Sequence, residues 1–190
     1  MLDPILLRIA KSSILSYIES ANKIDKEHLI SKYTFLKEYG AAFVTLHYEK
    51  DLRGCIGSIV AHTTLLEDVI SNASSAAFRD PRFNPLSSDE FSHLSLEVSV
   101  LSKPKLLEYT DFDDLVEKIR PNIDGLILKH IGYQGTFLPQ VWEQLPDTRI
   151  FLEHLSMKAG SNPSIYNEHP EIYTYQVDAI EKKFDEIEPL

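Results

Sequence analysis

The chain has 190 residues, with 19 basic and 29 acidic side chains, and a formal net charge of −10. Hydrophobic residues make up 43% and charged residues 25%, as in an ordinary folded domain. A chain of this length buries about 70% of its unfolded surface, so its core needs no disulfide or metal, and we expect a single domain over residues 1–190. The 7 glycines and 10 prolines exclude a low-complexity chain. The acidic balance argues against nucleic acid as a partner.

Cys55 is the one cysteine, which excludes an internal disulfide and a cysteine-based metal site within the chain. It fits a reducing compartment, and we expect a cytoplasmic location. No His-Glu-x-x-His pair, EF-hand loop or P-loop occurs, so we expect no metal and no cofactor. No stretch of about 18 apolar residues is present, and we expect no contact with a membrane.

The N-terminal segment predicts an amphipathic helix that packs on the core. Its apolar residues from Leu2 to Ala21 recur with i, i+3, i+4 spacing, which is not the continuous apolar block of a signal peptide. Asp3 is a candidate N-cap, and Pro4 fits the first helical position. Residues 25–33 predict a short helix or turn.

The middle of the chain predicts a β-hairpin, a helix and a strand. The hairpin strands are residues 41–48 and 52–60, joined by the polar turn 49–51. Thr63 or Thr64 can cap a helix that runs to about Arg79, and one helical turn is expected at 87–90. Residues 94–101 alternate between apolar and polar, as in a strand with one buried face.

The last third adds smaller elements. We expect helices at 111–119, 140–144 and 148–158, strands at 126–130 and 136–138 around a Gly132/Gly135 turn, Gly160 as a helix stop, and a final strand at 172–177. Helices and strands mix without regular β-α-β alternation. The pattern therefore favours an α+β fold with a mostly antiparallel sheet packed by helices.

The segment Leu52-Arg53-Gly54-Cys55-Ile56-Gly57 holds the first candidate site residues. On a regular strand, Arg53 and Cys55 share one face, which Gly57 continues. Gly54 and Gly57 weaken a strand, and such glycines often mark a bulge or a place where a ligand or another backbone comes close. Because an arginine beside a thiol favours the thiolate, Cys55 is a candidate nucleophile. A buried, inert cysteine explains the same pattern.

A nucleophile also needs a base. His47 lies on the preceding strand and can face Arg53 or Cys55, and His62 follows the second strand. Either could serve, and either could be an ordinary surface histidine.

A second candidate group lies at the end of the central helix. Arg79, Asp80 and Arg82 alternate with aromatic residues there, and they form either a charged latch that ends the helix or a clamp for an anion. Asp80 can pair with Arg79 or with Arg82. Glu97 lies in the middle of a strand, where it either lines a pocket or faces solvent.

Six blocks in order carry a resemblance to one family. They are Leu52–Gly57, Ala77–Phe83 followed by Pro85-Leu86, Leu96–Ser102, Asp124–Leu128, Thr136–Trp142 and Lys158–Gly160. Together they resemble the AMMECR domain family over roughly residues 5–178. The run Leu138–Pro146 most resembles the prokaryotic branch, AmmeMemoRadiSam system protein A. The turn at residues 130–134 departs from relatives that carry basic residues there, which puts a role for positive charge at this turn in doubt.

The resemblance implies an α+β fold with a smaller appended subdomain, and a functional cleft lined by the Arg53-Gly54-Cys55 strand. It also implies protein partners, because prokaryotic relatives are often encoded beside a Memo-type protein and a radical-SAM enzyme. The family's biochemical activity is not established, so the resemblance specifies the fold better than the function.

Two functions remain open. The first is a component that binds a ligand or these partners, with Arg53, Gly54, Gly57, Arg79, Asp80, Arg82 and Glu97 as binding residues. The second is a cysteine-dependent enzyme that acts through Cys55 on a small molecule or a protein side chain.

Overall fold

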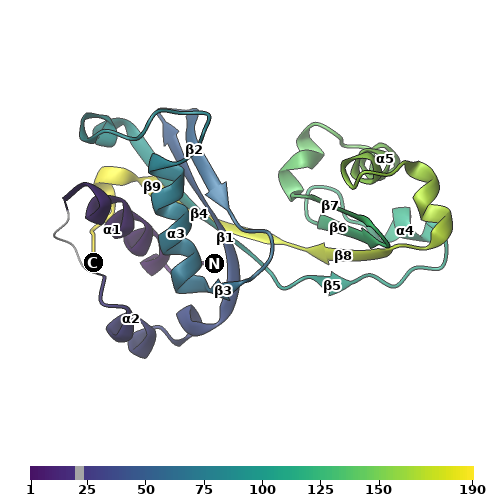
Figure 1. Cartoon of the computed structure of the whole chain (residues 1–190), viewed down its shortest axis with the longest axis horizontal. Coiled ribbons are helices and arrows are strands. Elements are labelled where there is room, and N and C mark those ends of the chain that lie inside the picture. Colours follow the sequence, from purple (N-terminus) through teal and green to yellow (C-terminus); the bar gives the residue numbers. More distant parts are fainter. Residues whose placement is uncertain (20–23) are drawn as a thin grey trace. The chain divides into compact units, whose positions relative to one another are not determined.

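The computed structural model describes residues 1–19 and 24–190, and these form two compact units (Figure 1). The first unit comprises residues 1–101 and 178–190, and the second comprises residues 102–177. Both combine helices with antiparallel strand pairs, which confirms the α+β class. The smaller second unit fits the expected appended subdomain. That residues 1–190 act as one domain stays a prediction.

The first unit is built around a sheet with the strand order β2-β1-β4-β9, and the short β3 also pairs with β1. Its strands are β1 (Tyr39–Tyr48), β2 (Asp51–Gly57), β3 (Thr63–Thr64), β4 (Leu94–Leu101) and β9 (Val177–Lys183). Its helices are α1 (Ile5–Glu19), α2 (Lys26–Lys32) and α3 (Leu65–Phe78). Short 3-10 turns lie at Thr34–Lys37, Ser88–His93 and Phe184–Glu186.

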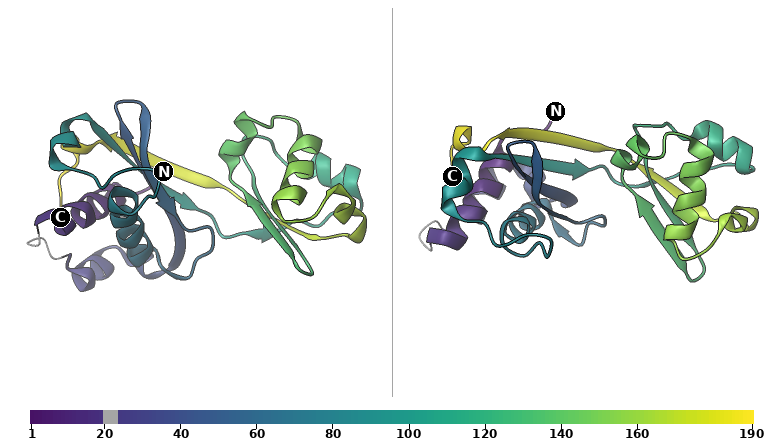
Figure 2. Two further views of the ribbon diagram at one scale, coloured as in Figure 1. Left: turned by 45° about the horizontal axis from the view of Figure 1, so that its top comes forward. Right: turned by 90° about the horizontal axis from the view of Figure 1, so that it is seen from above.

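Helices α1 and α3 cover one face of this sheet (Figures 1 and 2). Ala42, Val44 and Leu46 of β1 point into that core, because alternate strand residues face the same side. The small side chains of Ala73 and Ala76 let α3 approach the strands closely. The opposite face of the sheet is therefore the one that carries Phe43, Thr45 and His47.

Most expectations for this unit are confirmed. Asp3 accepts the backbone N–H of Ile5 at the start of α1, whereas the predicted continuation to Ala21 lies outside the described residues. Thr64 caps α3 through the N–H of Glu67, and Arg79 is the C-cap residue. The strand predicted at 94–101 is β4, with the same bounds.

The strand predicted at 52–60 is wrong at its end, because β2 stops at Gly57. The next residue, Ser58, belongs to a buried polar network. The Ser58 hydroxyl donates to Asp68 Oδ1, and Asp68 Oδ2 accepts the N–H of Ala42 and the amide of Asn72. The Ser58 N–H still donates to the Ala42 carbonyl of β1, and Ile59 and Val60 are exposed in the loop that follows.

The second unit has its own sheet, with the order β5-β8-β6-β7. Its elements are β5 (Lys105–Leu106), α4 (Phe112–Lys118), β6 (Gly125–His130), β7 (Tyr133–Phe137), α5 (Thr148–Lys158) and β8 (Glu171–Tyr175), with 3-10 turns at Pro139–Glu143 and Pro163–Glu168. Trp142 anchors its core: the indole ring stacks on Phe151 at 3.7 Å between centroids and donates to the Asp124 carbonyl at 2.8 Å.

Two expectations for this unit are corrected. Gly135 is not in the turn but inside β7, where a side chain would collide with the backbone of Ala159, the C-cap residue of α5. The turn is made by Ile131 and Gly132, and the φ of Gly132 is +79°. The single strand predicted at 172–177 is two strands, β8 and β9, separated by Gln176. The sequence analysis did not predict β9, because four of its seven residues are charged. Gly160 ends α5 with φ +89°, as expected.

Candidate functional site

The candidate site is built on β2, which is an edge strand with a bulge. Leu46 pairs with Gly54, but the next residue of β1, His47, pairs with Leu52, so Arg53 is the extra residue. Strict alternation therefore does not extend from Cys55 to Arg53. The bulge is one of the two features that the glycines of this segment predict.

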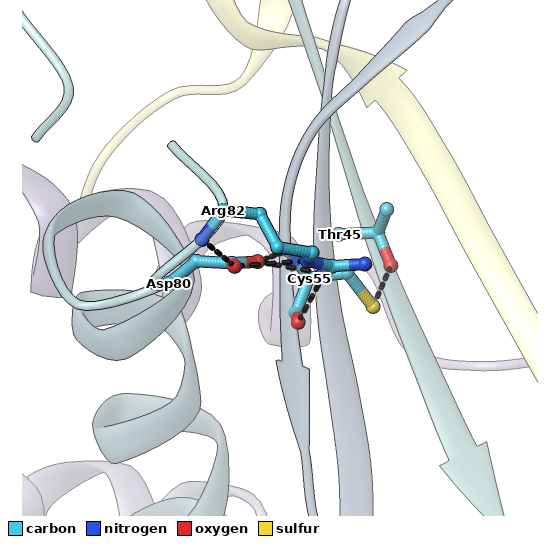
Figure 3. A network of polar contacts seen from close by, with 4 residues as sticks. All are labelled: Thr45, Cys55, Asp80 and Arg82. Carbon is cyan, nitrogen blue, oxygen red and sulfur yellow. Dashed lines mark hydrogen bonds and ion pairs between the residues drawn. The ribbon is translucent and has the colours of Figure 1, made fainter. Parts of the chain in front are cut away.

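Asp80 and Arg82, which follow α3, bind the outer edge of β2 at Cys55 (Figure 3). The Cys55 N–H donates to Asp80 Oδ2 at 2.9 Å, and the Cys55 carbonyl accepts from Arg82 Nη2 at 3.2 Å. Arg82 also binds Asp80 through Nε at 3.0 Å and Nη2 at 2.7 Å. We call this arrangement the edge latch. It gives both backbone groups of Cys55 a partner at a place where the sheet offers none.

The edge latch favours the ionised form of the Asp80 carboxyl. Its side chain is only 2% exposed, and the hydrogen bond from Arg82 holds the pKa of the Asp80 carboxyl far below its ordinary value. The same contact raises the pKa of Arg82. Of the two sequence interpretations, the structure shows the charged latch, with Arg82 rather than Arg79 as the partner of Asp80.

A second ion pair holds the bulge. Arg53 Nε and Nη2 donate to the two carboxylate oxygens of Glu90 at 2.6 and 3.0 Å, and the guanidinium lies 5.9 Å from the ring centroid of Phe83. The Arg53 hydrogen bond is the main cause that lowers the pKa of Glu90. The N–H and hydroxyl of Ser87 also donate to Glu90. Arg53 thus binds a carboxylate of its own chain, with both pair members largely buried.

The Cys55 thiol lies on the other side of its backbone, toward β1 (Figure 3). Thr45 Oγ1 donates to Sγ at 3.3 Å, and Thr45 is itself buried. Cys55 is half-buried. Across the sheet, Cys55 pairs with Thr45, and Thr45 pairs with Glu97, so these three residues form one row on the face opposite α3. Glu97 Oε1 accepts from the Ser99 hydroxyl at 2.9 Å.

The two glycines make room for the protein's own atoms. A Cβ on Gly54 would lie 2.2 Å from the Ala76 carbonyl oxygen of α3, and one on Gly57 would lie 2.2 Å from the Phe43 ring. The close approach that the glycines predict is therefore made by a backbone at Gly54 and by an aromatic side chain at Gly57.

The remaining predicted residues lie apart from the thiol. Arg79 is exposed at the end of α3, and His62 is exposed in the loop before β3. His47 Nδ1 lies 3.3 Å from Glu181 Oε1, which in turn accepts from the Ser95 hydroxyl. In the part of the chain that the structure describes, the hydrogen-bond partner of the Cys55 thiol is Thr45 and not a histidine.

Sequence reasoning missed two contributors to this site: Thr45 and Glu90. The alternation of 94–101 places Ser99 on the face of Glu97, as the structure has it, and the alternation of β1 could have placed Thr45 on the same face. The Ser87-x-x-Glu90 spacing is that of a capping box, which the structure contains. No sequence signal indicates that Glu90 also binds Arg53.

No group of three or more His, Cys, Asp or Glu side chains within residues 1–19 and 24–190 is arranged to hold a metal ion. Over the same residues, none of the helices has the length and apolar character needed to cross a membrane.

The fold and the site define a class of protein: two α+β units, with a glycine-rich, bulged edge strand that carries a cysteine and is latched by an Asp-x-Arg segment. The sequence model of the AMMECR1 family matches residues 7–180, and the chain belongs to that family. Protein SSO0193 of Saccharolobus solfataricus is 41% identical over 170 residues, which cover 85% of this chain and 73% of that protein. Protein MJ0810 of Methanocaldococcus jannaschii is 35% identical over 188 residues, which cover 96% and 89%.

A solved structure shows the same fold. The crystal structure of protein PH0010 from Pyrococcus horikoshii superimposes with a TM-score of 0.75 at 32% identity, and covers 98% of this chain and 96% of that one. The expected α+β fold of this family is thereby confirmed.

Proposed function

We propose that this chain is a binding component of the prokaryotic AmmeMemoRadiSam branch of the family, which acts in the cytoplasm with a Memo-type protein and a radical-SAM enzyme. Its binding surface is the β2 edge and the adjoining row of Cys55, Thr45 and Glu97. The family resemblance supports the partners, and the geometry of the site supports binding over turnover.

One observation carries the preference for binding. Arg53, two residues before Cys55, and Arg82, which binds the Cys55 carbonyl, each bind a carboxylate of the same chain through two nitrogens. Because these charges are already compensated, they hold the shape of the strand rather than activate the thiol. The thiol itself contacts a hydroxyl, which is a weak base.

The test is a direct binding measurement by calorimetry and analytical ultracentrifugation. The intact chain is titrated with the Memo-type protein and with the radical-SAM enzyme from the same genome. We expect a complex with at least one of them, retained by Cys55→Ala and weakened at least about tenfold by Arg53→Ala, because that change frees Glu90 and the bulge. Circular dichroism establishes that each variant is folded.

Two outcomes contradict the proposal. One is the absence of a complex with either protein. The other is a folded Cys55→Ala variant that no longer binds, because then the thiol and not the latched strand is essential. If Arg53→Ala does not fold, the exposed Arg79→Ala replaces it, since Arg79 lies beside the edge latch and makes no side-chain hydrogen bond within the described residues.

The second candidate is a cysteine-dependent enzyme, and the Thr45 contact favours it. A hydroxyl that donates to sulfur stabilises a thiolate, and Cys55 is not fully buried. The rate of Cys55 alkylation is measured against pH in the folded protein, with denatured protein as control. A fast rate well below pH ~8.5 supports an activated thiolate. No labelling until the protein unfolds rules this candidate out.

A further inference from the structure

β7 is an edge strand that lacks the usual protection against pairing with another chain. It is the last strand in the order β5-β8-β6-β7 and pairs with β6 on one side (Figure 1). Charges, prolines and bulges normally protect such an edge, whereas the β7 sequence Tyr-Gln-Gly-Thr-Phe holds neither a charged residue nor a proline. Tyr133 is 41% exposed, and Ile131 in the turn before it is 90% exposed, so this end of the strand is open to other molecules.

The strands at the other ends of the two sheets carry this protection. β2 is bound by the edge latch. β9 has four charged residues among its seven. β5 has only two residues, of which Lys105 is charged and follows Pro104 directly. Among the strands that end the two described sheets, β7 is therefore the one at which a second strand meets no charge.

The β6–β7 hairpin leaves two residues of β7 with backbone groups that point outward. Its two-residue turn closes on the hydrogen-bonded pair of His130 and Tyr133, and such pairs then alternate along an antiparallel ladder. Gly135 is in the next hydrogen-bonded pair. The N–H and C=O of Gln134 and Thr136 therefore point away from β6, and they form no hydrogen bond with another part of the described chain.

We propose that β7 pairs with β7 of a second copy of this chain, so that the two four-stranded sheets join across a twofold axis. The two strands run antiparallel, with Gly135 at the centre and Gln134 opposite Thr136 of the second copy. This register pairs every outward N–H and C=O of these two residues in both copies. Because each copy uses the same surface, the assembly closes at two chains.

The side chains of β7 suit this pairing. In the same register, Tyr133 lies opposite Phe137 of the second copy, and aromatic cross-strand pairs stabilise antiparallel strands. Gly135 places no side chain at the centre, where a Cβ would already collide with Ala159 of its own chain.

The charges of the chain also favour β7 as the contact between copies. Each copy has a net charge of −10, so a contact between copies is favourable only where like charges stay apart. The β7 strand is neutral. Lys129 lies one strand further in, on β6, and contacts the Tyr173 ring, so both β7 strands separate the Lys129 side chains of the two copies. The Cys55 row takes no part, and failure of this proposal leaves the proposed function untouched.

Sedimentation equilibrium of the intact chain over a concentration series tests the proposal. We expect monomers and dimers without larger assemblies. Gln134→Pro removes one outward N–H and keeps the ladder with β6, because proline is tolerated where the N–H of an edge strand faces outward. We expect it to raise the dissociation constant of the dimer at least about tenfold, whereas the matched Gln134→Ala, which keeps the N–H, stays within about twofold. A chain that is monomeric throughout overturns the proposal, and so does a dimer that Gln134→Pro leaves unchanged.

Amide hydrogen exchange gives a second measurement, on the natural chain. We expect the amides of Gln134 and Thr136 to exchange more slowly as the protein concentration rises, and the amide of Gly135, which is bonded to β6, to stay unaffected. Exchange at both positions that does not depend on concentration overturns the proposal, because any dimer then forms elsewhere. Circular dichroism establishes that the variants are folded, and Thr136→Pro replaces Gln134→Pro if that variant is unstable. A folded, monomeric Gln134→Pro chain is also the background in which association through the other edge strands is measured.

Discussion

Gly54 is a residue at which the first unit depends on the absence of a side chain. Its backbone faces the Ala76 carbonyl at the end of α3, and the space between them cannot hold a methyl group. The contact joins the edge strand to the helix that carries the edge latch. A change here therefore affects the position of Cys55 as well as stability.

We expect Gly54→Ala to lower the free energy of unfolding by about 2 kcal/mol or more, because the strand must move away from a rigid helix backbone. Urea unfolding monitored by circular dichroism measures this. Gly132→Asn is the matched control: nothing lies within 4 Å of its added Cβ, and asparagine tolerates a positive φ, so a change below about 0.5 kcal/mol is expected. Equal stability of Gly54→Ala and the natural protein would contradict the described contact.

The segment between α3 and β4 is held against β2 by charged side chains. The ion pair of Glu90 with Arg53 joins it to β2. The ion pair of Asp80 with Arg82 lies within the segment, and both of its members hydrogen-bond the Cys55 backbone of β2. Both carboxyls have a pKa below the ordinary value. A carboxyl with a lowered folded pKa stabilises the fold above its unfolded pKa, and this contribution is lost as the pH falls toward the folded pKa.

Glu90→Gln tests this pH dependence. At pH 7 we expect it to cost about 2 kcal/mol, because Arg53 loses a charged, two-oxygen acceptor. Below the unfolded Glu pKa of about 4.3 the carboxyl is protonated first in the unfolded chain and, at its lower pKa, then in the folded protein, so the difference between the two proteins shrinks as the pH falls. Urea titrations at pH 7 and pH 3.5 compare them. A difference that does not depend on pH would mean that the Glu90 charge is irrelevant, and Glu67→Gln, at an exposed pair, is the control.

Local sequence patterns predicted most elements of this fold. They failed where residues far away in the sequence determine the end of an element or a contact. The i, i+3, i+4 spacing of α1 and the alternation of β4 depend on neighbours in the chain, and both were predicted. The end of β2 depends on Asp68 and Asn72 of α3, which no local pattern reveals. The candidate site follows the same rule. The residues of the edge latch were predicted, but their contact with the Cys55 backbone could not be.

At the scale of the whole molecule, we expect the two units to unfold together. The chain passes between them twice, at 101–102 and 177–178, and Gln176 is the single residue between β8 and β9. Within the second unit, Gln176 and Ser102 exchange hydrogen bonds beside these crossings. Such short connections favour one cooperative transition.

Trp142 gives a selective probe because it is the one tryptophan and lies in the second unit. If residues 1–190 form one domain, Gly54→Ala in the first unit will lower the urea midpoint seen by Trp142 fluorescence as much as the midpoint seen by far-UV circular dichroism. An unchanged fluorescence midpoint would show that the two units unfold independently.

The edge latch has a further consequence, for the behaviour of many molecules in solution. An uncovered edge strand presents free N–H and C=O groups to other chains, and proteins avoid this by placing charges or loops over such edges. Asp80 and Arg82 occupy these groups at Cys55 from within the same chain. We therefore expect Asp80→Ala to self-associate as its concentration rises, even under conditions in which it stays folded. Light scattering over a concentration series checks this, and a variant that stays monomeric throughout would show that the edge of β2 is protected by other means.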